Sequence, residues 1–117
     1  MIKTKMFYSH LVDLSDLVVK LECLKLDEQE REEIVDLIED ILHHRILDSL
    51  LDVIPPEHHE GFLERMIEDP TDPQLIAHLK EISTYDPEIK IMTVTEIVKQ
   101  EIVLDIYLSK PSKKKRY

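Results

Sequence analysis

The sequence predicts an all-α protein, a compact bundle of about five helices with one long central helix. Gly61 is the single glycine among 117 residues, so tight hairpin turns and the glycine-rich loops that hold phosphate groups are not expected. Six prolines serve as chain breakers instead, which suits helices that stop and restart at short turns. Apolar residues also recur at three- and four-residue steps, the spacing of one helix face.

Local start and stop signals divide the chain into five predicted helices. Asp27 followed by Glu30 has the form of a capping box, and Pro55-Pro56 ends the long helix that follows. Two later helices each open on an acidic residue followed by proline, a cap with a preset first turn. The predicted helices cover about 11–25, about 28–53 and about 57–68, then a segment opened by Asp72-Pro73 and a segment opened by Asp86-Pro87.

The fifth segment is rich in β-branched residues, so a strand over about 88–94 is the alternative to a helix there. Its only partner for pairing would be residues 2–8, and an isolated strand is not stable. The prediction is therefore a helix.

The long second helix carries two apolar stripes that a straight helix would point in different directions, roughly 140° apart at 100° per residue. It either bends near His43, packs against different elements on its two sides, or offers one stripe to another subunit. The first stripe holds Ile34, Val35, Leu37, Ile38, Ile41 and Leu42. The second stripe holds Val53 and five residues that form the predicted interface: Ile46, Leu47, Leu50, Leu51 and Ile54.

Charge divides the chain into an acidic body and a basic tail. Residues 1–108 form one predicted helical domain, irregular over 1–10, with 25 acidic against 10 basic side chains, a net charge of −15. Such a body repels phosphate backbones, so contact with nucleic acid is expected only through the tail. The tail, 109–117, is predicted to be disordered, and its candidate contacts to a polyanion are Lys110, Lys113, Lys114, Lys115 and Arg116.

Residues with chemical potential do not form a recognisable site. Cys23 lies among leucines, which predicts a buried core thiol and, as the lone cysteine, a reducing cytoplasmic setting. The pairs His43-His44 and His58-His59 lie among carboxylates but lack the spacing of a zinc motif, so a solvated polar face is predicted rather than a metal site. No catalytic residue, cofactor, small-molecule ligand or membrane span is expected.

Three leucine-rich patterns occur in order along the chain: Leu21-x-x-Leu24 before an acidic helix, Ile46-Leu47-x-x-Leu50-Leu51, and Phe62-Leu63-x-x-Met66 before an acid-rich closing helix. With them the stretch 17–107 resembles a family of short all-helical bacterial domains of unknown function. The resemblance implies a helical fold and supplies no activity, cofactor or functional residue.

The sequence as a whole predicts a non-enzymatic, acidic protein–protein interaction module, either an adaptor that docks on a basic partner or a homodimer. Two other classes stay open. One is a small nucleic-acid- or ribosome-associated factor that uses the basic tail. The other is a small metal-dependent enzyme built on the histidine pairs.

Overall fold

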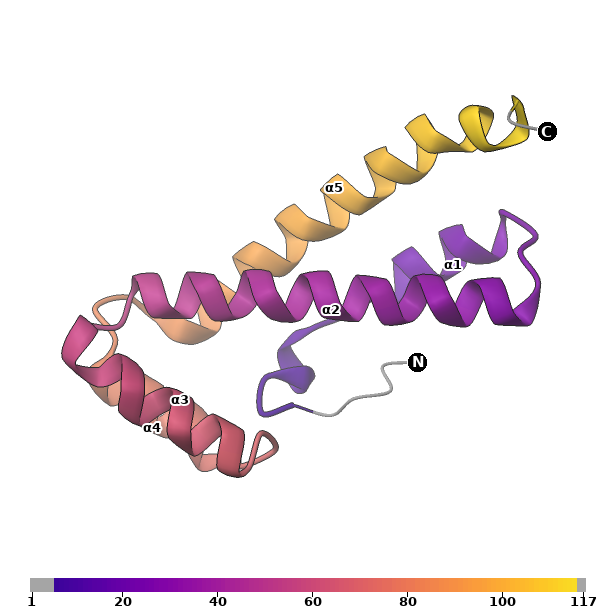
Figure 1. Cartoon of the computed structure of the whole chain (residues 1–117). Coiled ribbons are helices and arrows are strands. Elements are labelled where there is room, and N and C mark those ends of the chain that lie inside the picture. The colour runs from indigo at the N-terminus through magenta and orange to yellow at the C-terminus, as the bar shows by residue number, and fades with distance from the viewer. Residues whose placement is uncertain (1–5, 116–117) are drawn as a thin grey trace.

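The computed structural model describes the backbone of residues 6–115 and the side chains of residues 6–105, and this part of the chain is all-α (Figure 1). The region proposed as a possible strand, 88–94, lies inside a helix, as predicted. In chain order the elements are η1 (Ser9–Leu11), α1 (Ser15–Glu22), α2 (Glu28–Asp52), η2 (Pro56–His58), α3 (His59–Glu68), α4 (Gln74–Ile82) and α5 (Pro87–Lys115).

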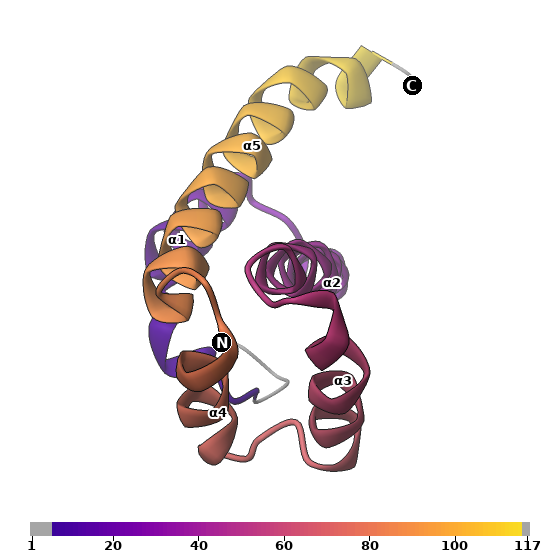
Figure 2. The ribbon, with the colours of Figure 1, turned by 90° about the vertical axis from the view of Figure 1, so that its left-hand side faces the viewer.

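The long central helix of the prediction is α2, which packs most extensively against α5. Its first turn is held by the predicted capping box: Glu30 N donates to Asp27 Oδ1 at 2.8 Å, and Asp27 N donates to Glu30 Oε1 at 3.2 Å. Figure 2 looks along α2 and shows α4 and α5 on one side of it, with α3 below it. One side of α2 therefore faces the interior.

The buried side chains of α2 form one continuous stripe, which corrects the two displaced stripes of the sequence analysis. Leu37 and Ile41 are 58% and 38% exposed, so they do not belong to the core. Without them the buried positions fall within a sector of about 120°, which an unbent helix can bury on one side. The buried residues are Val35, Ile38, Leu42, Ile46 and Leu50.

Acidic caps before proline start the last two helices, as predicted. Asp72 Oδ1 accepts a hydrogen bond from Gln74 N at 2.9 Å, ahead of α4. Asp86 Oδ1 accepts from Glu88 N at 2.9 Å in the first turn of α5. Each carboxylate satisfies a backbone N–H group that has no partner within its helix.

The prediction of Cys23 as a buried core thiol was wrong, because its side chain is exposed. Helix α1 covers Ser15–Glu22, so it starts later and ends earlier than the predicted 11–25, and Lys25 follows in a left-handed conformation with φ of 58°. The buried residues of α1 are Leu17 and Leu21. A residue two positions after Leu21 lies about 160° around the helix from it, which directs Cys23 away from the core.

The N-terminal segment contributes to the core, a role that the sequence analysis did not assign to it. Phe7 and Tyr8 are buried, and Phe7 N donates to Pro70 O at 2.7 Å. The Phe7 ring meets the Phe62 ring of α3 edge to face, with centroids 6.1 Å apart. This contact joins the start of the chain to α3.

Disorder was predicted over 109–117, but the backbone of α5 continues as a helix to Lys115. The side chains of the predicted polyanion contacts lie outside the described residues, so those contacts stay a prediction.

Gly61 lies in the first turn of α3 and not in a turn that requires glycine, since its φ is not positive. A Cβ atom built on it would meet nothing within 4 Å. We expect Gly61→Ala to raise the free energy of unfolding by about 0.5–1 kcal/mol, because alanine loses less backbone entropy on folding. Urea denaturation checks this, and a midpoint that falls would contradict it.

Candidate functional site

The predicted interface on the second half of α2 is mostly not on the surface. Ile46 and Leu50 have no exposed area and Ile54 is buried, so these three residues belong to the protein's own core. Leu47 and Leu51 are half-buried and pack against the same core. The apolar periodicity correctly marked residues that another element buries, but these elements are helices of the same chain and not a second protein.

The exposed apolar surface of α2 lies instead in its first half, where it adjoins exposed residues of α5. Leu37 and Ile41 share a helix face with Arg45, at steps of four residues. Arg45 Nη1 donates to Glu101 Oε1 of α5 at 2.7 Å, and Nη2 donates to Oε2 at 3.3 Å. The two helix faces therefore meet on one side of the molecule.

On α5, Ile97 and Leu104 flank Glu101 at steps of four and three residues and share its face. Ile97 is 46% exposed and Leu104 is 58% exposed. The two helices run in roughly opposite directions (Figure 1). Because Ile41 precedes Arg45 by one turn and Leu104 follows Glu101 by one turn, both lie in the same direction from the Arg45–Glu101 pair. We call the four exposed apolar residues Leu37, Ile41, Ile97 and Leu104 the α2–α5 face.

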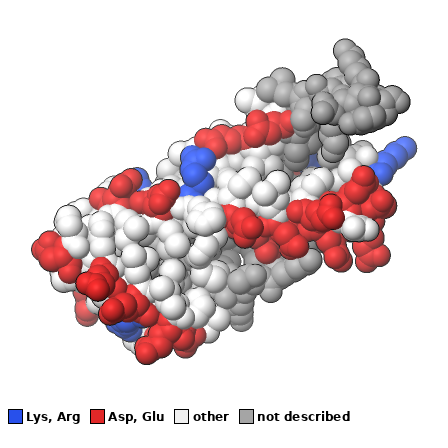
Figure 3. All heavy atoms as spheres, in the orientation of Figure 1, with Lys and Arg blue, Asp and Glu red and all other residues white. Residues whose placement is uncertain are grey.

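Acidic side chains border this face. Figure 3 shows a pale band of surface between two rows of acidic residues, one along α2 and one along α5. On α2, exposed Glu33 lies one turn before Leu37, and exposed Asp48 lies two turns after Ile41. On α5, Arg45 holds the pKa of Glu101 below its usual range, so this carboxylate stays ionised. Most of the charges around this face are therefore negative, although Leu104 also lines a groove with Lys20 and Lys99.

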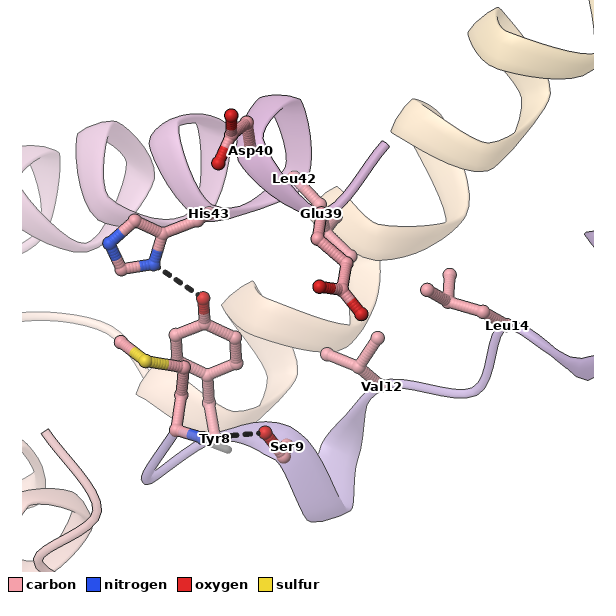
Figure 4. A pocket seen from close by; sticks show the side chains of 9 residues that line it. Tyr8, Ser9, Val12, Leu14, Glu39, Asp40, Leu42 and His43 are labelled. Carbon is pink, nitrogen blue, oxygen red and sulfur yellow. Dashed lines mark hydrogen bonds between the residues drawn. The ribbon is translucent and has the colours of Figure 1, made fainter. Parts of the chain in front are cut away.

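A second candidate site is a pocket of about 130 Å³ between the N-terminal segment and α2 (Figure 4). Its central polar contact joins Tyr8 Oη to His43 Nδ1 of α2 at 2.6 Å. Burial lowers the pKa of His43, and the charge of nearby His44 lowers it further. The neutral ring and the phenol share this one hydrogen bond, and the pKa of Tyr8 is raised first by burial and then by the charge of Glu39. The pair stays neutral near pH ~7.

The shifted pKa of His43 makes stability depend on pH. The unfolded chain takes up a proton on His43 near pH ~6.5 but the folded chain only at lower pH, so stability is lost as the pH falls below that value. The groups around His43 are Tyr8 from the N-terminal segment and Asp40 and His44 from α2 itself. We expect wild type to lose more stability than His43→Gln between pH ~7.5 and ~5.5, measured by urea denaturation. An equal loss in both proteins would contradict this.

The remaining histidines of the two pairs do not form a metal centre in the described part of the chain, where no group of three or more His, Cys, Asp or Glu side chains is placed to hold an ion. His59 Nε2 lies 2.9 Å from Leu51 O and 2.8 Å from Ile54 O. Its N–H therefore satisfies backbone carbonyls at the C-terminal end of α2, which is a structural role.

Sequence reasoning missed both candidate sites. Tyr8 and His43 are 35 positions apart, and no local motif signals their contact. The α2–α5 face was not predicted because Leu37 and Ile41 fit the apolar pattern of core residues.

None of the described helices combines the length and the apolar content needed to cross a membrane.

No family model, curated protein or solved structure matches this chain. The resemblance to short helical bacterial domains therefore stays a prediction.

Proposed function

We propose that the protein is a non-enzymatic interaction module that docks a basic, amphipathic helix of a partner protein on its α2–α5 face. The observation that carries the proposal is the exposure of Leu37, Ile41 and Leu104 beside the Arg45–Glu101 pair, within an acidic surround. An apolar patch rimmed by charge is typical of a protein-binding surface.

The mode of docking follows from the fold. The described chain has no strand and hence no sheet edge to which a partner could add a strand. Two exposed helix faces side by side suit a helix that lays its apolar side between them, with anchors at steps of three and four residues.

Charge and area favour a basic partner over a second copy of the chain. Residues 26–79 carry 16 acidic side chains against Arg31, Arg45 and Arg65, so two such surfaces repel one another. Four half-exposed aliphatic side chains also fall far short of the ~2,000 Å² or more that obligate homodimers bury. Lysine and arginine on a partner would instead be attracted by the acidic rows.

The location proposed for this module is the cytoplasm, since a chain with a single cysteine is typical of a reducing compartment. Binding of a polyanion by the basic tail is a less favoured function than docking of a basic helix, because the acidic body would repel the polyanion and weaken the complex.

The proposal is tested with two fluorescent model helices that share the same leucine positions, one carrying lysine on its flanks and the other glutamine. We expect the lysine helix to bind, and its affinity to fall as NaCl is raised. Leu104→Gln should weaken binding about tenfold, the equivalent of ~1.4 kcal/mol, because most of an exposed leucine contact is lost.

Ile67→Gln is the matched control, because Ile67 is 75% exposed on α3 and lies outside the face. Equal binding of both helices, or an equal loss in the control variant, would contradict the proposal. Light scattering should give the single-chain mass of 13.8 kDa. A doubled mass that Leu104→Gln abolishes would assign the face to self-association and overturn the basic partner.

A further inference from the structure

The Arg45–Glu101 ion pair lies across the middle of the α2–α5 face. Arg45 comes from α2 and Glu101 from α5, and hydrogen bonds of 2.7 and 3.3 Å join their side chains. These side chains remain 42% and 52% exposed, so the pair is part of the surface that a docked partner would meet. The pair therefore divides the apolar residues of the face into two groups.

The two groups lie on opposite sides of the pair. Ile97 precedes Glu101 by four residues on α5, and Leu104 follows it by three. Ile41 lies on the Leu104 side, because α2 and α5 run in roughly opposite directions (Figure 1). Leu37 is one turn farther along the same side. The larger group thus holds three residues of the face, and the smaller group holds Ile97.

This spacing sets the register of a docked helix. Ile97 and Leu104 are seven residues apart, which is a rise of about 10.5 Å or two helical turns. A partner helix that runs along α5 therefore contacts these two residues with side chains at its own positions i and i+7. Positions i+3 and i+4 share that side of the partner and lie over the ion pair, whichever way the partner runs.

A large side chain at i+3 or i+4 would oppose docking. It would hold the partner away from the face, since the distance between packed helices depends on the side chains at their contact. It would also displace water from the ion pair, and removing water from charged groups is unfavourable. A charged side chain gains little there, because the guanidinium and the carboxylate already neutralise each other. A small side chain avoids the separation and covers less of the pair.

We propose that the α2–α5 face selects a partner helix that has small residues, alanine or serine, midway between two apolar residues seven positions apart. This inference rests on the proposed function, because it specifies which basic helices dock. Ile97 and Leu104 receive the two apolar residues, and the Arg45–Glu101 pair determines the specificity between them.

The test compares two fluorescent helices that carry lysine on their flanks and leucine at i−4, i, i+7 and i+11. One helix has alanine at i+3 and i+4, and the other has leucine at both positions. Because the pattern is symmetric, it is the same in either direction of docking. Fluorescence anisotropy should show that the alanine helix binds the wild-type protein at least about tenfold more tightly. Apolar contact without the ion pair would favour the leucine helix instead.

Two outcomes separate this inference from the proposed function. Equal binding of the two helices, or tighter binding of the leucine helix, would overturn the inference and leave the docking face in place. Binding of neither helix would overturn both.

Variants test whether the ion pair is the cause of the preference. Arg45→Ala combined with Glu101→Ala removes the pair without leaving an unpaired charge, and the preference for the alanine helix should disappear. Lys80→Ala combined with Glu88→Ala is the matched control, because it removes a 3.1 Å ion pair between α4 and α5 that lies outside the face. Exposed ion pairs contribute little to stability, so both variants should stay folded. A preference that persists in the first variant, or is lost in the second, would overturn the assignment to the Arg45–Glu101 pair.

Discussion

Leu50→Ala is expected to lower the free energy of unfolding by about 2–5 kcal/mol. Leu50 lies on the buried stripe of α2 and has no exposed surface. The variant loses the burial of the removed carbon atoms and leaves a cavity that the surrounding helices fill only in part. Urea denaturation followed by circular dichroism measures the change.

Leu37→Ala is the matched control, because it makes the same substitution on the same helix at a residue that is 58% exposed. Its free energy of unfolding should stay within about 0.5 kcal/mol of wild type. A similar loss in both variants would mean that the α2–α5 face is part of the core and not available to a partner.

Phe62→Ala is expected to have an effect of about 3–5 kcal/mol. The Phe62 ring is fully buried and is the α3 residue that meets Phe7 of the N-terminal segment. Its removal opens a large cavity and also releases one attachment of the N-terminal segment, so the signals of Tyr8 should broaden or shift as well. Both effects are visible in one NMR and denaturation series.

Ile67→Ala on the same helix controls for helix propensity, since Ile67 is 75% exposed and should change stability little. If Phe62→Ala lost less than about 1 kcal/mol, α3 would not be fixed to the core through this ring. A loss of stability with unchanged Tyr8 signals would instead mean that the N-terminal segment is held independently of Phe62.

Much of the fold was predictable from the sequence because its boundaries are set by local chemistry. Asp27 and Glu30 make a capping box within four residues, and Asp86 caps the helix that Pro87 opens. Such signals need no knowledge of the rest of the chain. They placed the start of α2 and the start of α5 where the structure has them.

Burial was less predictable, because an apolar residue on a helix is buried only where another element covers it. Leu37 and Ile46 are alike in character, yet one is 58% exposed and the other is fully buried. Phe7 is buried because the N-terminal segment packs against Phe62. Each outcome depends on packing between distant segments.

The sequence by itself determined the helical class, the starts of α2 and α5, and the acidic charge of the body. Only the tertiary structure decided which apolar side chains stay exposed and which polar groups meet. Helix starts depend on residues within one turn, whereas the Arg45–Glu101 and Tyr8–His43 contacts join residues 56 and 35 positions apart. Both candidate sites exist because packing of the whole chain brings those pairs together.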